Sequence, residues 1–194
     1  GLSAVLVTSP QGHILLDGAL PQSAPLIVEN IKALGFRIED VKYILNSHAH
    51  WDHAGGIAAL QRASGATVVA SASGALGLQS GTNGKDDPQY QADPVVHVAK
   101  VAKVKVVGEG DTVKVGPLVL TAHMTPGHTP GGTTWTWTSC EGARCLNVVY
   151  ADSLNPYASG DFTYTGKGAG KDRTPDISAS FEASIAKVAA LPCD

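Results

Sequence analysis

The sequence has 194 residues, of which 43% are hydrophobic and 16% charged, a balance typical of a folded globular chain. Its net charge is -3 and it contains no basic run, which argues against nucleic-acid binding and against binding to an anionic membrane. No apolar segment is long enough to span a bilayer, and three lysines interrupt the valine-rich stretch 95–107. The length suits one hydrophobic core, so we expect a single domain over residues 1–194.

The first third of the chain predicts strands that alternate with two helices. The first helix begins after Ser23, which can cap it, and carries Ile27, Ile31 and Leu34 on one apolar face. The second helix covers residues 54–63. Apolar runs bounded by turn residues predict strands at residues 4–8, 13–17, 41–45 and 67–70.

The middle of the chain, residues 74–93, is rich in Gly, Ser, Asp and Pro and is predicted to be a long loop after a short helix. A last helix is expected from Asp176 to Ala190, with Phe181 and Ile185 on its apolar stripe. Alternating patterns predict further strands at residues 103–106, 113–115, 118–122, 134–138 and 146–150. Strands with interspersed helices indicate a layered α/β domain.

The strongest functional signal is a histidine cluster where a predicted strand ends and a helix begins. Four side chains that can bind a metal fall within six residues, His48 to His53. His48 and His50 can point the same way, as alternate residues of an extended chain do, while Asp52 and His53 can face a second position nearby. Imidazole and carboxylate ligands without a thiolate suit a catalytic zinc site that keeps an open position. Ordinary loop histidines are the alternative, and this density argues against it.

This H-x-H-x-D-H pattern resembles the signature of the metallo-β-lactamase superfamily. The segment Pro126-Gly127-His128-Thr129 resembles the family's downstream PGHT loop, whose histidine completes the first zinc site. The resemblance implies a fold, an α/β αββα sandwich of two mixed β-sheets flanked by helices, and a cofactor, two zinc ions per active site. It also implies ligands, which are His48, His50 and His128 for the first zinc and Asp52 and His53 for the second.

Three details favour the subclass B3 branch of the family. The strand Trp135-Thr136-Trp137-Thr138 resembles the B3 pattern after the PGHT loop. Ser153 stands where the B1 enzymes carry a cysteine ligand, and the ending Leu191-Pro192-Cys193-Asp194 resembles the segment just before the family's last zinc histidine. The resemblance therefore implies a chain truncated at both ends, with an incomplete second zinc site.

The implied reaction is hydrolysis of the amide bond of a small-molecule β-lactam by a metal-bound hydroxide, without a covalent intermediate. Asp52 would orient the attacking hydroxide, and Ser153 would lie near the metal-bound water. In glyoxalase-like relatives an aspartate in the region of Asp152 bridges two metals. The B3 resemblance instead implies a residue behind the ligands, and a capped strand end is the alternative. We expect the protein to be a monomer.

Cys140 and Cys145 flank the turn Glu141–Arg144 between two predicted strands. The paired ends of such a hairpin can meet disulfide geometry, with Cα atoms about 5.5–6 Å apart. We therefore predict a Cys140–Cys145 disulfide and an exported, periplasmic protein; two reduced thiols in a cytosolic protein are the alternative.

Two other functions remain open. A glyoxalase II-like thioesterase or a lactonase of the same superfamily would use the same zinc residues. The implied truncation also allows an inactive zinc-binding fragment, for which one firmly held zinc and weak or absent hydrolysis are expected. Serine hydrolase chemistry is disfavoured, because neither Ser47 nor Ser153 lies in a G-x-S-x-G elbow.

Overall fold

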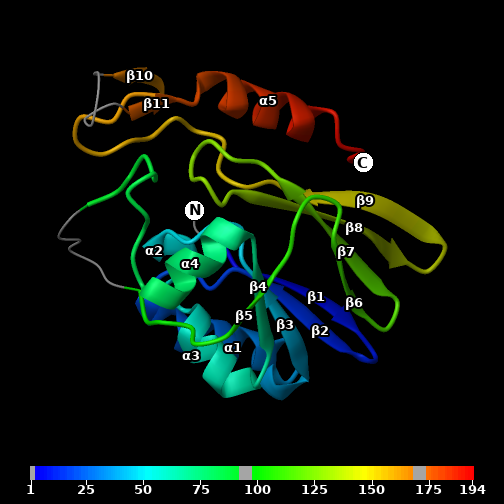
Figure 1. The fold of residues 1–194 in the computed structure, drawn as a ribbon. Coiled ribbons are helices and arrows are strands. Elements are labelled where there is room, and N and C mark those ends of the chain that lie inside the picture. Colours follow the sequence, from blue (N-terminus) through cyan, green and yellow to red (C-terminus); the bar gives the residue numbers. More distant parts are fainter. Residues whose placement is uncertain (1–2, 92–97, 168–173) are drawn as a thin grey trace.

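A computed structural model describes residues 3–91, 98–167 and 174–194. Two β-sheets face each other and helices cover their outer faces (Figure 1). This arrangement confirms the predicted αββα sandwich. A separate two-stranded ribbon, formed by β10 (Thr165–Lys167) and β11 (Thr174–Asp176), precedes the last helix.

The first sheet has five strands in the order of the chain. The β1–β2 pair is antiparallel, and the three following pairs are parallel, so this sheet is mixed as expected. Its central strands are almost wholly buried because the sheet is covered on both faces. The strands are β1 (Val5–Ser9), β2 (Gly12–Leu16), β3 (Val41–Leu45), β4 (Thr67–Ala70) and β5 (Val104–Val106).

The second sheet is antiparallel throughout, which differs from the mixed sheet that was expected. Its strands follow one another along the chain, and such neighbours pair antiparallel across short connections. Trp135 and Leu120 are fully buried between the two sheets. The strands are β6 (Thr112–Val115), β7 (Leu118–Met124), β8 (Thr133–Glu141) and β9 (Arg144–Tyr150).

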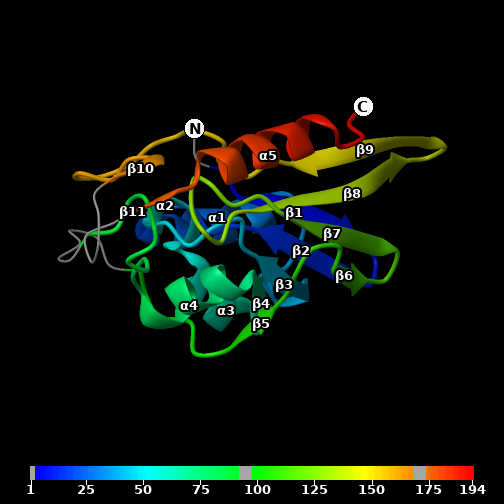
Figure 2. The ribbon, with the colours of Figure 1, turned by 45° about the horizontal axis from the view of Figure 1, so that its top comes forward.

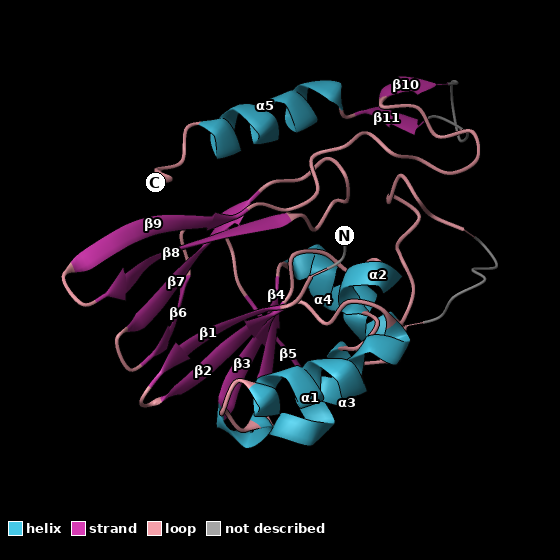
Figure 3. Cartoon of the chain, turned by 180° about the vertical axis from the view of Figure 1, so that it is seen from behind, coloured by secondary structure: helices cyan, strands magenta, loops and turns pink. Residues whose placement is uncertain are grey.

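The helices form the two outer layers (Figures 2 and 3). Three of them cover the first sheet, and α5 (Ser178–Ala189) lies over the second. Among the described residues, no helix has the length and apolar character needed to cross a membrane. The helices on the first sheet are α1 (Ala24–Ala33), α3 (Ile57–Ser64) and α4 (Ala72–Ser80), and the short α2 (Trp51–Ala54) follows β3.

Two predicted boundaries were wrong in ways that bear on the site. The helix predicted over 54–63 is two helices, α2 and α3, separated at Gly55 and Gly56. A Cβ atom on Gly56 would collide with the carbonyl oxygen of Gly18, so a glycine there lets α2 approach β2 closely. The short helix expected before the 74–93 loop is α4, which extends into that range as far as Ser80. Ser71 Oγ caps it by accepting a hydrogen bond from the backbone of Gly74 at 3.1 Å.

Smaller predictions about helix faces and caps were also wrong. The Ser23 side chain makes no capping hydrogen bond, because a 3-10 turn at Pro21–Ser23 leads directly into α1. Leu34 follows the last helical residue and is 69% exposed. The last helix begins at Ser178 rather than Asp176; Phe181 is buried as expected, whereas Ile185 is 42% exposed.

The predicted disulfide between Cys140 and Cys145 is confirmed. The two residues are directly paired across β8 and β9, next to the turn at Gly142. Their Cα atoms lie 4.0 Å apart, closer than expected.

Candidate metal centre

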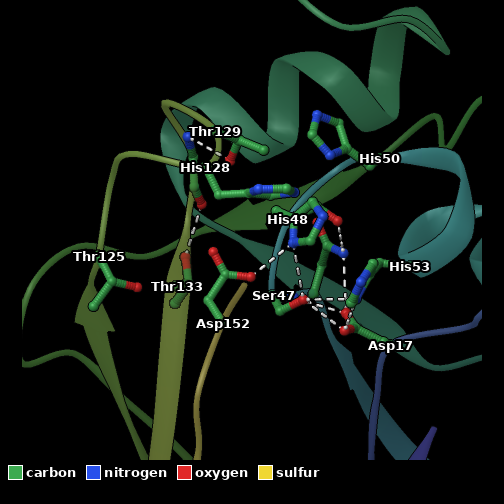
Figure 4. A network of polar contacts seen from close by, with 12 residues as sticks. Asp17, Ser47, His48, His50, His53, Thr125, His128, Thr129, Thr133 and Asp152 are labelled. Atoms are coloured by element: carbon green, nitrogen blue, oxygen red, sulfur yellow. Dashed lines mark hydrogen bonds and ion pairs between the residues drawn. The ribbon is translucent and has the colours of Figure 1, made fainter. Parts of the chain in front are cut away.

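Three histidines from two distant segments converge at one end of the sandwich (Figure 4). His48 and His50 follow β3, and His128 lies in the loop between β7 and β8. The centroids of the three rings lie 4.7 to 5.0 Å apart. One nitrogen of each ring lies within 4.8 Å of the others, so the three can bind one metal ion together.

The outward nitrogen of each ring contacts an oxygen that fixes the tautomer. A carbonyl or ionised carboxylate oxygen only accepts a hydrogen bond, so the ring nitrogen facing it must donate and the inward nitrogen keeps its lone pair. The three contacts are His48 Nδ1 to Asp152 Oδ1 at 2.7 Å, His50 Nε2 to Asp87 Oδ1 at 3.0 Å, and His128 Nδ1 to the Asn155 carbonyl at 2.9 Å.

The inward lone pairs fit a metal ion. His48 Nε2 is buried and has no hydrogen-bond partner among the described residues, an arrangement that is costly without a ligand. The Gln89 side-chain amide donates to the other two inward nitrogens, at 3.2 Å to His50 Nδ1 and 3.1 Å to His128 Nε2. Three converging imidazole lone pairs are a donor set that zinc prefers in catalytic sites.

A second group of possible ligands adjoins the first. His48, Asp52 and His53 each offer one atom within 4.8 Å of the others. The Asp52 Oδ2 and His53 Nε2 atoms lie 4.0 Å apart, and His53 Nδ1 contacts Asp17 Oδ2 at 3.0 Å. The structure therefore brings all five predicted ligands together in two adjoining groups.

Asp17 is the centre of a buried hydrogen-bond network that sequence reasoning missed. Its carboxylate accepts hydrogen bonds from the backbone and hydroxyl of Ser47 at 2.7 and 2.6 Å and from Tyr150 at 2.9 Å. Burial opposes ionisation of Asp17, but hydrogen bonds from His53 and Ser47 outweigh it and lower its pKa. In the sequence, Asp17 was only the last residue of the strand predicted at 13–17, which gave no role to its side chain.

Burial also sets the protonation of the histidines. Burial and the neighbouring histidines lower the pKa of His48 well below its ordinary value, and burial lowers that of His128. Both rings are therefore neutral near pH 7, the form that binds a metal. Burial lowers the pKa of His53 as well, but the contact with Asp17 outweighs it and raises the value overall.

An open cleft of about 340 Å³ lies against the histidines. His50, His128 and Asp52 form part of its lining, together with Ser153. Asp152 faces away from this cleft and contacts His48, which agrees with its interpretation as a residue behind the ligands. Ser153 therefore lies where it could contact a bound small molecule.

Two of the residues in this centre lie in the predicted middle loop. Asp87 and Gln89 contact His50 from the segment after α4. The only sequence signal for them was the polar composition of that loop, which did not distinguish them from their neighbours.

Comparisons with known proteins agree with this geometry. The sequence profile of the metallo-β-lactamase superfamily matches residues 2–141. The solved Rm3 metallo-β-lactamase is 56% identical with a TM-score of 0.93, and the match covers 100% of this chain and 70% of that one. The subclass B3 metallo-β-lactamase MEM-A1, from a soil metagenome library, is 54% identical with a TM-score of 0.93, over 100% of this chain and 71% of that one.

A curated relative with another activity matches a shorter region. A hydroxyacylglutathione hydrolase of Anaeromyxobacter dehalogenans (strain 2CP-C) is 34% identical over 96 residues, which are 50% of this chain and 29% of that protein. The chain thus corresponds to less than a third of this relative's length. The profile match, the fold and the convergent histidines together show that the chain belongs to the metallo-β-lactamase superfamily, with subclass B3 enzymes among its structural neighbours.

Proposed function

We propose that this protein is a zinc-dependent β-lactamase. The observation that carries the proposal is the convergence of three imidazole lone pairs beside an open cleft. Whole-chain similarity to metallo-β-lactamases at 56% and 54% identity supports β-lactams as the substrate class.

The ligand roles follow from the geometry of the two groups. His48 Nε2, His50 Nδ1 and His128 Nε2 would hold the first ion, and Asp52 and His53 would contribute to the second. When bound, zinc supplies a hydroxide nucleophile near neutral pH and polarises the substrate carbonyl, so no serine nucleophile is needed.

Two other side chains act directly on the reactants in this proposal. The Asp52 carboxylate is 33% exposed and faces the cleft, where it can accept a hydrogen bond from the attacking water and orient it. The Ser153 hydroxyl lines the same cleft and can donate to a substrate carboxylate. Trp51, 45% exposed, and Tyr157, 58% exposed, add aromatic surface for the apolar part of a substrate.

Disulfides persist in oxidising compartments, so the Cys140–Cys145 bond supports an exported protein, and we propose that it resides in the periplasm.

The second candidate is a thioesterase of the glyoxalase II type. It is favoured by the 34% identity to a hydroxyacylglutathione hydrolase, although that match covers half of the chain. Both reactions would use the same ligands, so the distinction depends on the substrate.

The test compares substrates on one preparation. The zinc-loaded and the metal-stripped chain are assayed with a chromogenic cephalosporin, an acylglutathione thioester and an acyl-homoserine lactone. We expect the cephalosporin to have the highest kcat/KM, and metal removal to abolish its hydrolysis. A higher kcat/KM for the thioester would favour the second candidate, and cephalosporin hydrolysis that survives metal removal would contradict the proposal.

A further inference from the structure

Asp87 lies 37 positions after His50, yet its carboxylate faces the imidazole of that histidine. Both carboxylate oxygens lie close to His50 Nε2, at 3.0 and 3.1 Å, and Asp87 is only 6% exposed. A buried carboxylate at this distance requires the ring proton to be on Nε2.

A second contact on the opposite side of the ring agrees with that proton position. The Gln89 amide nitrogen lies 3.2 Å from His50 Nδ1, and an amide N–H needs a lone pair to accept its hydrogen bond. The two contacts therefore select one tautomer, with the Nδ1 lone pair directed toward His48 and His128.

The position of Asp87 is itself fixed by its own loop. Its Oδ1 accepts a hydrogen bond from the Gln89 backbone at 2.8 Å. Its backbone N–H donates to the Gly84 carbonyl at 3.0 Å, and its carbonyl accepts from Tyr90 at 2.9 Å. The carboxylate thus approaches His50 from a turn with little freedom to move.

The same turn joins the two loops that line the cleft. The backbone N–H of Ser159 donates to the Pro88 carbonyl at 2.9 Å, and Ser159 and Gln89 both line the cleft. The Asp87–His50 contact therefore connects a candidate metal ligand to the cleft wall.

We propose that Asp87 is a positioning residue of the metal centre. It holds His50 in the tautomer and orientation that present Nδ1 to the ion, and it anchors the cleft loops to that ligand. This inference rests on the proposed metal site, and it adds to that site a residue from the loop after α4.

The first experiment measures zinc affinity by competition with a chromogenic chelator. Asp87→Ala removes the contact, Asp87→Asn keeps an oxygen that can accept from Nε2, and Asp86→Ala is the matched control. Asp86 is the exposed neighbour of Asp87, and among the described residues it makes no hydrogen bond or ion pair with a histidine. We expect Asp87→Ala to weaken zinc binding 10- to 100-fold, the usual effect of losing a partner behind a metal ligand. Asp87→Asn should recover part of that loss, and Asp86→Ala should match the parent.

Cobalt(II) gives a spectroscopic measure of the same effect. The visible absorption of the cobalt-loaded protein should change in Asp87→Ala and stay unchanged in Asp86→Ala, because only Asp87→Ala removes the contact that orients His50. Equal zinc affinities and equal cobalt spectra for the two variants would overturn the proposal.

A measurement on the parent protein keeps the test valid if Asp87→Ala does not fold. Nitrogen NMR of the metal-free protein should show His50 protonated at Nε2 and unprotonated at Nδ1; the reverse tautomer would overturn the inference. Failure of this inference can be distinguished from failure of the proposed function. A parent chain that binds zinc through His50 but hydrolyses no β-lactam would contradict the proposed function alone, and one that binds no zinc would contradict both.

Discussion

The Asp17 Oδ2 atom lies 3.0 Å from His53 Nδ1, so the residue that follows β2 fixes a histidine at the start of α2. Asp17 is fully buried and has a positive φ of 58°, a conformation that Asn and Asp tolerate better than most residues. Position 17 therefore needs both a residue that tolerates positive φ and a side chain that accepts a hydrogen bond from His53.

Replacement of Asp17 should separate these two requirements. We expect Asp17→Ala to lower the free energy of unfolding by about 3–5 kcal/mol, because it leaves His53, Ser47 and Tyr150 without their shared partner. Asp17→Asn keeps an acceptor and the tolerance for positive φ, and should cost about 1–3 kcal/mol. Denaturant unfolding of the metal-free proteins measures both, with Asp40→Ala, at a half-exposed aspartate, as control. An Asp17→Ala protein as stable as the control would contradict the network.

Replacement of His48, in the ligand cluster, should weaken zinc binding far more than replacement of His123, outside it. Loss of a hydrogen-bond partner behind a metal ligand weakens metal binding by up to roughly 100-fold. We expect His48→Ala to weaken zinc binding by more than this, because the variant loses a ligand itself. His123→Ala is the control, since His123 belongs to neither ligand group. Its Nε2 atom forms a hydrogen bond with Thr136 Oγ1 at 2.9 Å. Chelator competition measures both variants. Equal losses for His48→Ala and His123→Ala would be incompatible with the assignment.

An ion pair between Lys187 and Glu109 joins helix α5 to the loop between β5 and β6, and its pH dependence can be tested. Slight burial opposes ionisation of Glu109, but hydrogen bonds from Lys187 Nζ at 2.9 Å and from the Met124 backbone at 2.8 Å outweigh it and lower the Glu109 pKa below 4.5. The unfolded chain therefore takes up a proton first as the pH falls. The stabilisation is present above pH 4.5 and is lost as the pH falls through the lowered pKa.

The matching variant is Glu109→Gln. Because Glu109 is half-exposed, we expect the parent to be more stable by less than about 1 kcal/mol near pH 6. The two proteins should become equally stable as the pH falls below 4.5. A stability difference that persists or grows at low pH would show that the charge of Glu109 is not responsible.

The Cys140–Cys145 bond should affect stability and leave the metal centre unchanged. The bond closes a loop with a sequence separation of 5, for which the loop-closure model gives about 2 kcal/mol. The hairpin tip lies at the opposite end of β8 from Thr133, whose backbone N–H donates to the Ser47 carbonyl next to His48. We expect the double variant Cys140→Ser/Cys145→Ser to unfold more easily and to keep the parent zinc affinity. Cys193→Ser, at an exposed free cysteine, is the control. A double variant that loses zinc affinity would contradict this independence.

The sequence marked the residues that converge in the two candidate ligand groups but not the partners behind them, for a physical reason. His48, His50, Asp52 and His53 fall within six residues, so spacing alone marked them. His128 was identified only through the resemblance to the PGHT loop. The aspartates behind the histidines come together only through tertiary packing, at sequence separations of 36 for Asp17, 37 for Asp87 and 104 for Asp152.

The layered fold was predictable because apolar periodicity marked most of its strands. The extent of helix α4 was not, since its Gly and Ser residues have weak helix propensity and the burial of Ala75 and Leu78 stabilises it instead. The break between α2 and α3 depends on the close approach of Gly56 to Gly18, a contact between segments far apart in the sequence.

The most direct test of the metal centre is anomalous X-ray diffraction from zinc-loaded crystals, recorded at the zinc absorption edge. We predict a peak about 2.0–2.1 Å from each of three atoms, His48 Nε2, His50 Nδ1 and His128 Nε2, with the aspartate and carbonyl contacts on the outward nitrogens preserved. A zinc peak bound by the outward nitrogens, or elsewhere on the protein, would contradict the account.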